Sequence, residues 1–382
     1  MNTDKIINNK DQENNNNSDE PPIGRGKCYP KINRLKWNNW KWQNANRITS
    51  KEELSLYLDL TKEEIERDRY FSITPYYLSL MNLNNINDPI RKMIVPTTYE
   101  LEVKDYESDD SLHEEESSPC KCLVHRYSNR ALFLVTGYCS VTCSFCTRSR
   151  IALKQACNQY IKKDWVEAIQ YIKDHREIND VIISGGDPLL LPDKSIEWIL
   201  KELRKIDRDL IIRIGTKVLT VLPMRITNDL CKILKKYAPI YINIHVEHPN
   251  ELTKEMKESC SKLINSGCIL GSQSVLLRDI NDNINILKNM FQKLLTFGVK
   301  PYYLFAVDLV KGTSHFRTTI DKGLELMYKL RGNISGMAIP AYIVDGVNGK
   351  GKVQLLPNSI IEKDEHKVVL KNYKGELFTY NY

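Results

Sequence analysis

Residues 136–148 of the chain read Thr136-Gly137-Tyr138-Cys139-Ser140-Val141-Thr142-Cys143-Ser144-Phe145-Cys146-Thr147-Arg148. Three cysteines stand here in a C-x3-C-x2-C spacing, and the apolar run Ala131–Thr136 just before them predicts a buried strand. Thiolates held so closely suit an iron–sulfur cluster or zinc. Structural zinc sites and electron-transfer clusters normally use four protein ligands, so a three-cysteine site leaves one metal open to a small molecule.

From this loop onward, short apolar runs alternate with amphipathic helical patterns. The predicted strands are Ala131–Thr136, Val181–Ser184, Leu210–Gly215, Ile240–His245, Ile269–Leu276, Pro301–Val307 and Ala338–Val344. The predicted helices include Trp165–His175, Ser195–Ile206, Thr227–Tyr237, Thr253–Ser266 and Ile284–Leu295. This alternation predicts βα units and a parallel sheet. About six such units favour a full or partial TIM-like barrel, in which chemistry occurs at the C-terminal ends of the strands.

The remaining segments differ in composition. We expect residues 1–30, which are rich in Asn and charged residues, to be a disordered tail, and residues 31–125 to be helical and loop-rich. Residues 126–337 would form the barrel, and residues 338–382 a C-terminal segment that ends in a hairpin of Lys367–Leu370 and Leu377–Tyr380. The acidic stretch Asp105–Glu116 has the composition of a solvated loop rather than a binding surface.

Composition excludes several classes of protein. The chain has 382 residues with 55 Lys+Arg and 48 Asp+Glu, a net charge of +7 that is too modest and too spread out to predict nucleic-acid binding. No apolar run approaches the ~20 residues of a membrane helix, and no signal peptide is evident, so we expect a cytoplasmic protein. Ten cysteines are too sparse for a disulfide scaffold.

Further segments share their order and spacing with one family. They are Ile73-Thr74-Pro75-Tyr76-Tyr77-Leu78-Ser79-Leu80, His125-Arg126-Tyr127, Cys146-Thr147-Arg148, Ser184-Gly185-Gly186-Asp187, His248-Pro249-Asn250-Glu251, Ser272-Gln273-Ser274-Val275-Leu276-Leu277-Arg278 and His315-Phe316-Arg317-Thr318. With the cysteine motif, they resemble the lysine 2,3-aminomutase family of radical S-adenosylmethionine enzymes. The resemblance implies an α/β fold, a partial TIM-like (β/α)6 barrel of radical S-adenosylmethionine type with a helical N-terminal region and a small C-terminal appendage.

The resemblance also implies two bound groups near the cysteine loop. Cys139, Cys143 and Cys146 would bind a 4Fe-4S cluster, whose open iron chelates the amino and carboxylate groups of S-adenosylmethionine. Ser184, Gly185, Gly186 and Asp187 would hold the methionine end, since glycines let the backbone approach a ligand and an Asp accepts from an ammonium. A simple βα turn with a helix-capping Asp is the alternative interpretation. His245 and Gln273 match positions that contact the nucleoside.

A second cofactor is implied by the loop 345–352. In the family, a lysine in this loop forms a Schiff base with pyridoxal 5′-phosphate, and the spacing to Pro357 indicates Lys352, with Lys350 as the competing choice. Arg126 and Arg130 match positions that contact the phosphate and the pyridine ring, which suits Arg as a bidentate anion binder.

The charges after two strands predict the substrate. Asp308 and Asp345 follow predicted strands, so both would lie at the strand-end face of the barrel. Two converging carboxylates repel each other unless a cation neutralises them, which favours a substrate with a cationic side chain. Both match positions that bind the distal ammonium of lysine in the family, and Arg148 matches the position that pairs with the substrate carboxylate.

The resemblance therefore implies an isomerase that interconverts L-lysine and L-β-lysine by 2,3-amino migration, with electrons from a flavodoxin- or ferredoxin-type donor. An arginine 2,3-aminomutase, or another enzyme that acts on a cationic amino acid, is the alternative in the same class. A radical enzyme that modifies RNA or protein, and a non-catalytic iron–sulfur or zinc module with Cys120 or Cys122 as fourth ligand, are alternatives from other classes.

Family members carry a zinc site between subunits, made by a cysteine after the Val275–Arg278 segment and a C-terminal cysteine cluster. Because Asn283 stands at the first position and the chain stops at Tyr382, we expect no zinc, and a homo-oligomer formed through other surfaces. The cysteines without an expected role are Cys28, Cys157, Cys231, Cys260 and Cys268, and buried thiols are the default for them.

Overall fold

The chain folds around a nine-stranded sheet whose strand order follows the sequence. The computed structural model describes residues 29, 32–153, 160–206 and 209–382. Seven strands run parallel: β2 (Arg130–Thr136), β3 (Asp180–Gly185), β4 (Ile211–Thr216), β5 (Ile240–His245), β6 (Cys268–Val275), β7 (Lys300–Phe305) and β8 (Ala341–Gly346). Strands β1 (Leu123–Tyr127) and β9 (Gly351–Leu355) flank them in antiparallel pairing. All seven predicted strands are confirmed.

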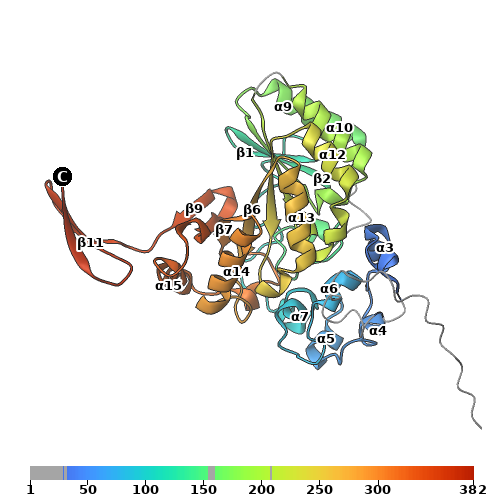
Figure 1. Cartoon of the computed structure of the whole chain (residues 1–382), viewed down its shortest axis with the longest axis horizontal. Helices are drawn as coiled ribbons and strands as arrows, with labels where there is room; N and C mark the ends of the chain where they lie inside the picture. The colour runs from blue at the N-terminus through green and yellow to red at the C-terminus, as the bar shows by residue number, and fades with distance from the viewer. Residues whose placement is uncertain (1–28, 30–31, 154–159, 207–208) are drawn as a thin grey trace, which may run out of the picture.

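Helices cover the outside of this sheet, as Figure 1 shows. They are α9 (Lys162–Asp174), α10 (Asp193–Arg204), α12 (Asn228–Lys236), α13 (Lys254–Asn265), α14 (Ile284–Thr296) and α15 (Ile320–Leu330). The short helices α8 (Ser149–Ala152) and α11 (Val218–Val221) follow the loops after β2 and β4. The sheet curves but stays open, because β1 and β9 are the ends of its strand order. The partial barrel is thus confirmed. None of the helices in the described part of the chain is long and apolar enough to span a membrane.

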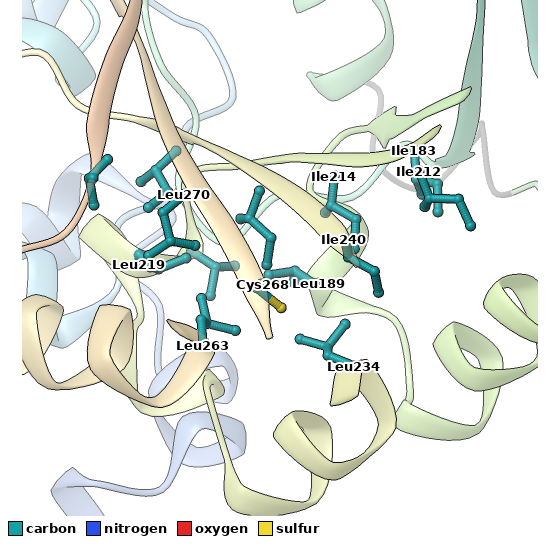
Figure 2. Packing of buried hydrophobic residues seen from close by; sticks show 14 of the residues in the cluster. Ile183, Leu189, Ile212, Ile214, Leu219, Leu234, Ile240, Leu263, Cys268 and Leu270 are labelled. Atoms are coloured by element: carbon teal, nitrogen blue, oxygen red, sulfur yellow. The ribbon is translucent and has the colours of Figure 1, made fainter. Parts of the chain in front are cut away.

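The main core lies between the sheet and these helices. Side chains from adjacent strands, including Ile212, Ile214 and Ile240, pack with Leu234 of α12 and Leu263 of α13 (Figure 2). β-Branched residues are typical of parallel strands that are covered on both faces. The thiols of Cys231, Cys260 and Cys268 belong to this core, as expected. Cys28 and Cys157 lie outside the described residues.

The N-terminal region is helical and loop-rich, and it forms a second core with the cysteine loop. Its helices are α2 (Arg34–Trp37), α3 (Trp40–Ala45), α4 (Lys51–Leu54), α5 (Lys62–Glu66), α6 (Pro75–Ser79) and α7 (Pro89–Ile94). Val141 and Phe145 of the loop pack into this core. Two backbone bonds fasten the loop there, from the Thr142 N–H to the Ser72 carbonyl (3.1 Å) and from the Ser144 N–H to the Met93 carbonyl (2.8 Å). The N-terminal region thereby fixes the path of the loop.

Strands β10 (Ile360–Lys363), β11 (Lys367–Lys371) and β12 (Leu377–Asn381) form a small sheet that projects from the barrel (Figure 1). The predicted hairpin is confirmed as β11 and β12. Strands β1, β9 and β10 were not expected. Because β1 and β9 are short and carry several polar residues, their apolar pattern is weaker than that of the central strands.

The interpretation of Asp105–Glu116 as a solvated loop is only partly right, because the segment has no helix or strand and exposes both its ends but also buries three side chains. The side chains of Glu107, Ser111 and Glu114 in this segment are buried. Three arginines from two other parts of the chain neutralise its carboxylates, which is how charged groups are tolerated inside a protein.

Candidate active site

Two adjoining cavities lie at the C-terminal ends of the parallel strands and inside the barrel. The cysteine cavity, about 170 Å³, is lined by Cys139, Cys143, Cys146 and the turn after β3. The Lys352 cavity, about 220 Å³, is lined by Lys352 and by both predicted aspartates. Side chains common to both walls are Phe145, Thr147, Arg148, Ser184, His245 and Val275. The two cavities are therefore neighbours that share part of their walls.

The three cysteines line their cavity as thiols that need a metal to ionise. Burial raises the pKa of Cys139, Cys143 and Cys146. Among the described residues, no group of three His, Cys, Asp or Glu side chains is placed to hold a single metal ion. A multi-iron cluster fits this arrangement, because each of its irons takes its own thiolate and the ligands need not converge on one point. Neither Cys120 nor Cys122 lines the cysteine cavity, which disfavours a fourth cysteine ligand.

The turn after β3 lies directly against the cysteine loop. The Gly186 N–H donates to the Thr136 carbonyl (2.6 Å), and the Asp187 N–H donates to the Tyr138 carbonyl (2.8 Å). A Cβ on Gly185 would lie 2.1 Å from the Thr136 oxygen, and a Cβ on Gly186 would lie 2.3 Å from the Tyr138 oxygen. Only glycine fits at either position, so the two segments are locked together beside the cavity.

Asp187 caps the short 3-10 helix η2 (Pro188–Leu190). Its buried carboxylate accepts from the Thr216 hydroxyl (2.7 Å) and from the N–H groups of Leu189 (3.2 Å), Lys217 (2.8 Å) and Val218 (3.1 Å). This is the capping role that was the alternative interpretation of the motif. Contact between this carboxylate and the ammonium of a cofactor stays a prediction.

Lys217, Glu247 and Glu251 form a buried charge network that the sequence analysis missed. Lys217 lines the cysteine cavity, and its ammonium pairs with Glu247 and, at 2.8 Å, with Glu251. Burial alone would lower the pKa of Lys217, but the two carboxylates raise it, so the side chain is a cation. The position of Lys217 just after β4 is the signal that could have revealed it, because barrel residues at strand ends face the site.

Glu247 also has an oxygen close to His245, one of the two residues expected to contact the nucleoside. Within the part of the chain that the structure describes, its Oε1 has no hydrogen-bond partner, and the Nδ1 of His245 lies 3.8 Å away. His245 and Gln273 are register partners on β5 and β6, and both line the Lys352 cavity. An unsatisfied buried carboxylate oxygen here fits a ligand that donates hydrogen bonds, such as the hydroxyls of a ribose.

Asp345 and Lys352 face each other across β8 and β9. They are register partners, and the Nζ of Lys352 lies 2.8 and 2.9 Å from the two carboxylate oxygens of Asp345. Lys352 was expected in a loop, but it lies on β9, because β8 and β9 pair through the tight turn between them. Lys350, the competing choice, is exposed and lies outside the set of residues that line the cavity.

Asp308 and Arg148 lie near each other on the cavity wall. The Thr147 hydroxyl donates to Asp308 (2.6 Å), and burial, together with the nearby Asp345, raises the pKa of Asp308 to about 6. The guanidinium of Arg148 holds both carboxylate oxygens of Glu114, which also lines the cavity. The cavity wall thus presents a cationic group beside two carboxylates.

Arg126 and Arg130 line the same cavity but differ in their partners. Arg130 on β2 donates to Asp180 (3.0 Å), and this carboxylate also binds Arg213. Arg126 on β1 donates to the Leu112 carbonyl, and its Nε is buried with no hydrogen-bond partner among the described residues. Arg126 is therefore the better placed of the two to meet a phosphate.

Comparison with known proteins gives two family matches. Residues 133–283 match the radical SAM superfamily, and residues 327–382 match the family described as lysine-2,3-aminomutase. The chain is 43% identical over 363 residues to L-lysine 2,3-aminomutase of Fusobacterium nucleatum, which covers 93% of this chain and 85% of the relative. It is 42% identical to the enzyme of the same name from Clostridium subterminale, over 94% of this chain and 87% of the relative.

The chain belongs to the lysine 2,3-aminomutase family. It is accordingly an isomerase with a radical S-adenosylmethionine barrel, and membership implies a 4Fe-4S cluster and S-adenosylmethionine. The three thiols and the glycine turn that line the cysteine cavity fit these groups.

The family is not uniform in substrate. Glutamate 2,3-aminomutase of Clostridioides difficile is 44% identical to this chain, over 89% of the chain and 82% of the relative. Identity alone therefore does not choose between a cationic and an acidic amino acid, and the charges that line the Lys352 cavity must decide.

Proposed function

We propose that this aminomutase interconverts L-lysine and L-β-lysine with pyridoxal 5′-phosphate bound through Lys352. The observation that carries the proposal is the presence of Asp308, Asp345, Arg148 and Lys352 on the walls of one cavity. Two carboxylates suit a distal ammonium, and a guanidinium suits an α-carboxylate. An external one-electron donor of flavodoxin or ferredoxin type belongs to the proposal.

The charges of the cavity argue against the acidic substrate of the glutamate relative. A side-chain carboxylate would meet Asp308 and Asp345, and a like-charge contact in a buried site costs several kcal/mol. Arginine, the same-class alternative, also has a cationic side chain that suits these carboxylates, so the substrate comparison below must separate it from lysine. Charge favours a cationic amino acid, and we propose lysine because of the family to which the chain belongs.

The residues of the chain bind, orient and shield the substrate. When bound, the cluster with S-adenosylmethionine supplies the radical, and pyridoxal phosphate supplies the group that carries the migrating nitrogen. In the proposal, Arg126 holds the phosphate, Arg148 holds the α-carboxylate, and Asp308 and Asp345 hold the distal ammonium. Fixing both ends of a flexible amino acid orients the carbon between them toward the cysteine cavity. Phe145, on the wall between the cavities, helps to exclude water.

In the proposal, Lys352 also controls whether Asp345 is neutralised. Its amine now neutralises Asp345, with which it shares an ion pair on adjacent strands. Lys352 would hold pyridoxal phosphate through this amine, and an amine used in that way would no longer neutralise Asp345. Asp345 would then be available to accept the ammonium of the substrate.

The test is a comparison of substrates with anaerobically reconstituted enzyme. L-lysine, L-arginine and L-glutamate are each incubated with S-adenosylmethionine, pyridoxal phosphate and a reductant, and the products are separated by amino-acid analysis. We expect β-lysine from lysine and no β-glutamate from glutamate. Conversion of arginine or glutamate with no conversion of lysine would refute the substrate assignment.

A further inference from the structure

The acidic segment, residues 105–116, crosses the rim of the Lys352 cavity. Leu112 and Glu114 line the cavity. The segment is fastened to the loop after β7, because the Ser108 N–H donates to the Leu309 carbonyl (3.1 Å) and the Lys311 N–H donates to the Ser108 carbonyl (3.2 Å). It therefore touches the loop that carries Asp308 as well as the loop that carries Arg148.

Glu114 makes the contact with Arg148. Its Oε1 accepts from the Nη2 of Arg148 at 2.6 Å, and the Nε donates at 3.0 and 3.1 Å to the two carboxylate oxygens. The bonds to Glu114 use only Nε and Nη2 of Arg148, and Nη1 takes no part in them. Glu114 is held in turn by Arg150 (3.3 Å), which also pairs with Asp110 (3.1 Å). Burial alone would raise the pKa of Glu114, but Arg148 and Arg150 lower it, so the carboxylate stays charged.

Glu107 makes the corresponding contact at the other end. Its buried carboxylate pairs with Nη1 of Arg317. The Nη2 of the same Arg317 donates to the carbonyls of Asp308 and Val310 (both 3.3 Å) and to the Thr313 hydroxyl (2.9 Å). Arg317 thereby ties the acidic segment to the backbone of Asp308 itself. This contact gives a role to the His315-Phe316-Arg317-Thr318 motif, to which the proposed function assigns none.

We propose that the acidic segment positions both ends of the substrate, Glu114 through Arg148 and Glu107 through the Arg317–Asp308 loop. Neither glutamate is a catalytic residue, because each acts through another side chain. The inference rests on the proposed function for the roles of Arg148 and Asp308. It makes a prediction that a merely structural segment would not, since each glutamate should affect the binding of one end of the amino acid only.

The experiment uses two competitive inhibitors of the holoenzyme that each lack one end. Norleucine has the α-amine and carboxylate of lysine but a neutral side chain, and cadaverine has both amines but no carboxylate. In E114Q, we expect the inhibition constant of norleucine to rise about 10-fold and that of cadaverine to change less than about 2-fold. In E107Q, we expect the inhibition constant of cadaverine to rise about 10-fold and that of norleucine to change less than about 2-fold. E116Q is the control, because Glu116 is exposed and pairs only with His113 among the described residues.

If either variant weakened the binding of norleucine and cadaverine equally, the effect would be a general structural one and the proposal would be overturned. The proposal would also be overturned if neither variant weakened the binding of either inhibitor. Removing one partner of a buried ion pair can prevent folding. E114D, which keeps the charge but shortens the side chain, is therefore measured as well, and norleucine should again weaken more than cadaverine.

A second measurement separates this proposal from the substrate assignment. Phenylglyoxal modifies accessible arginines, and peptide mass spectrometry gives the rate at Arg148 in the purified protein without any substrate. We expect the rate to rise several-fold in E114Q and to stay at the wild-type value in E116Q. An unchanged rate in E114Q would refute the positioning role of Glu114, whichever amino acid the enzyme converts.

Discussion

At the scale of single residues, Asp308 makes the activity depend on pH. Its pKa is raised to about 6 by burial and by Asp345, so the carboxyl is charged above this pH and neutral below it. A neutral Asp308 cannot attract an ammonium, so we expect kcat/KM for lysine to fall as the pH drops from 7 to 5. The fall should appear mainly in KM, because a bound cation holds Asp308 in its charged form.

The Asp308→Asn substitution tests this dependence. We expect kcat/KM at pH 7.5 to fall about 100-fold, about 2.7 kcal/mol, with loss of the acid limb in the pH profile. Asp321→Asn, at an exposed position on α15, is the control that should keep the wild-type profile. An acid limb that persists unchanged in D308N would assign the titration to another group.

Lys352 and Lys350 lie only two positions apart in the sequence, but their surroundings differ. Lys352 lines the cavity and pairs with Asp345, whereas Lys350 is not among the residues that line either cavity. We expect borohydride reduction of the enzyme with pyridoxal phosphate, followed by peptide mapping, to find the pyridoxyl group on Lys352. K350A should retain this modification, and K352A should lose it. Modification of Lys350 in the wild-type enzyme would contradict the assignment.

At the scale of elements, the contact between the β3 turn and the cysteine loop is a steric lock. A Cβ at residue 186 would lie 2.3 Å from the Tyr138 carbonyl oxygen, so Gly186→Ala must displace the loop that carries Cys139. We expect G186A to lose most of its iron and its cluster absorbance after reconstitution. Gly336→Ala is the matched control, because a Cβ there meets nothing within 4 Å. Full iron content in G186A would contradict the lock.

The elements also show what the sequence can and cannot predict. The apolar runs of β2 to β8 identified every parallel strand, because a strand covered on both faces has a continuous apolar signal. The strand β9 begins Gly351-Lys352 and is exposed at most positions, so it reads as a loop. The burial of part of the acidic segment could not be predicted for another reason. Its charges are neutralised by Arg148, Arg150 and Arg317, which are distant in the sequence.

The residues that line the candidate site could be predicted from the sequence better than the charged residues that hold them in place. All the expected site residues line one of the two cavities, because residues after parallel strands converge at one edge of a barrel. Glu247 and Glu114 were missed because a buried ion pair leaves no pattern along the sequence, whereas Lys217 could have been found from its position just after β4. The distinction between Lys352 and Lys350 needed the register of β8 and β9.

At the scale of the whole molecule, we expect the small sheet β10–β12 to take part in self-association. Its strand β12 exposes Leu377 (58%), Phe378 (49%) and Tyr380 (58%), and it is an edge strand. Exposed apolar edges favour pairing with another chain. We expect light scattering during size-exclusion chromatography to show an oligomer that Phe378→Lys weakens. Leu35→Lys, at an exposed leucine on α2, should leave the mass unchanged, and an unaltered mass in F378K would exclude this sheet as the contact.

The central claim is that the two cavities act on one molecule of lysine. The most direct measurement follows deuterium from L-lysine labelled at C3, using the reconstituted enzyme and mass spectrometry of products and cofactor. The account predicts that deuterium passes from C3 into recovered S-adenosylmethionine and also to C2 of β-lysine. Formation of β-lysine with deuterium in neither place, or at the same rate without S-adenosylmethionine, would contradict it.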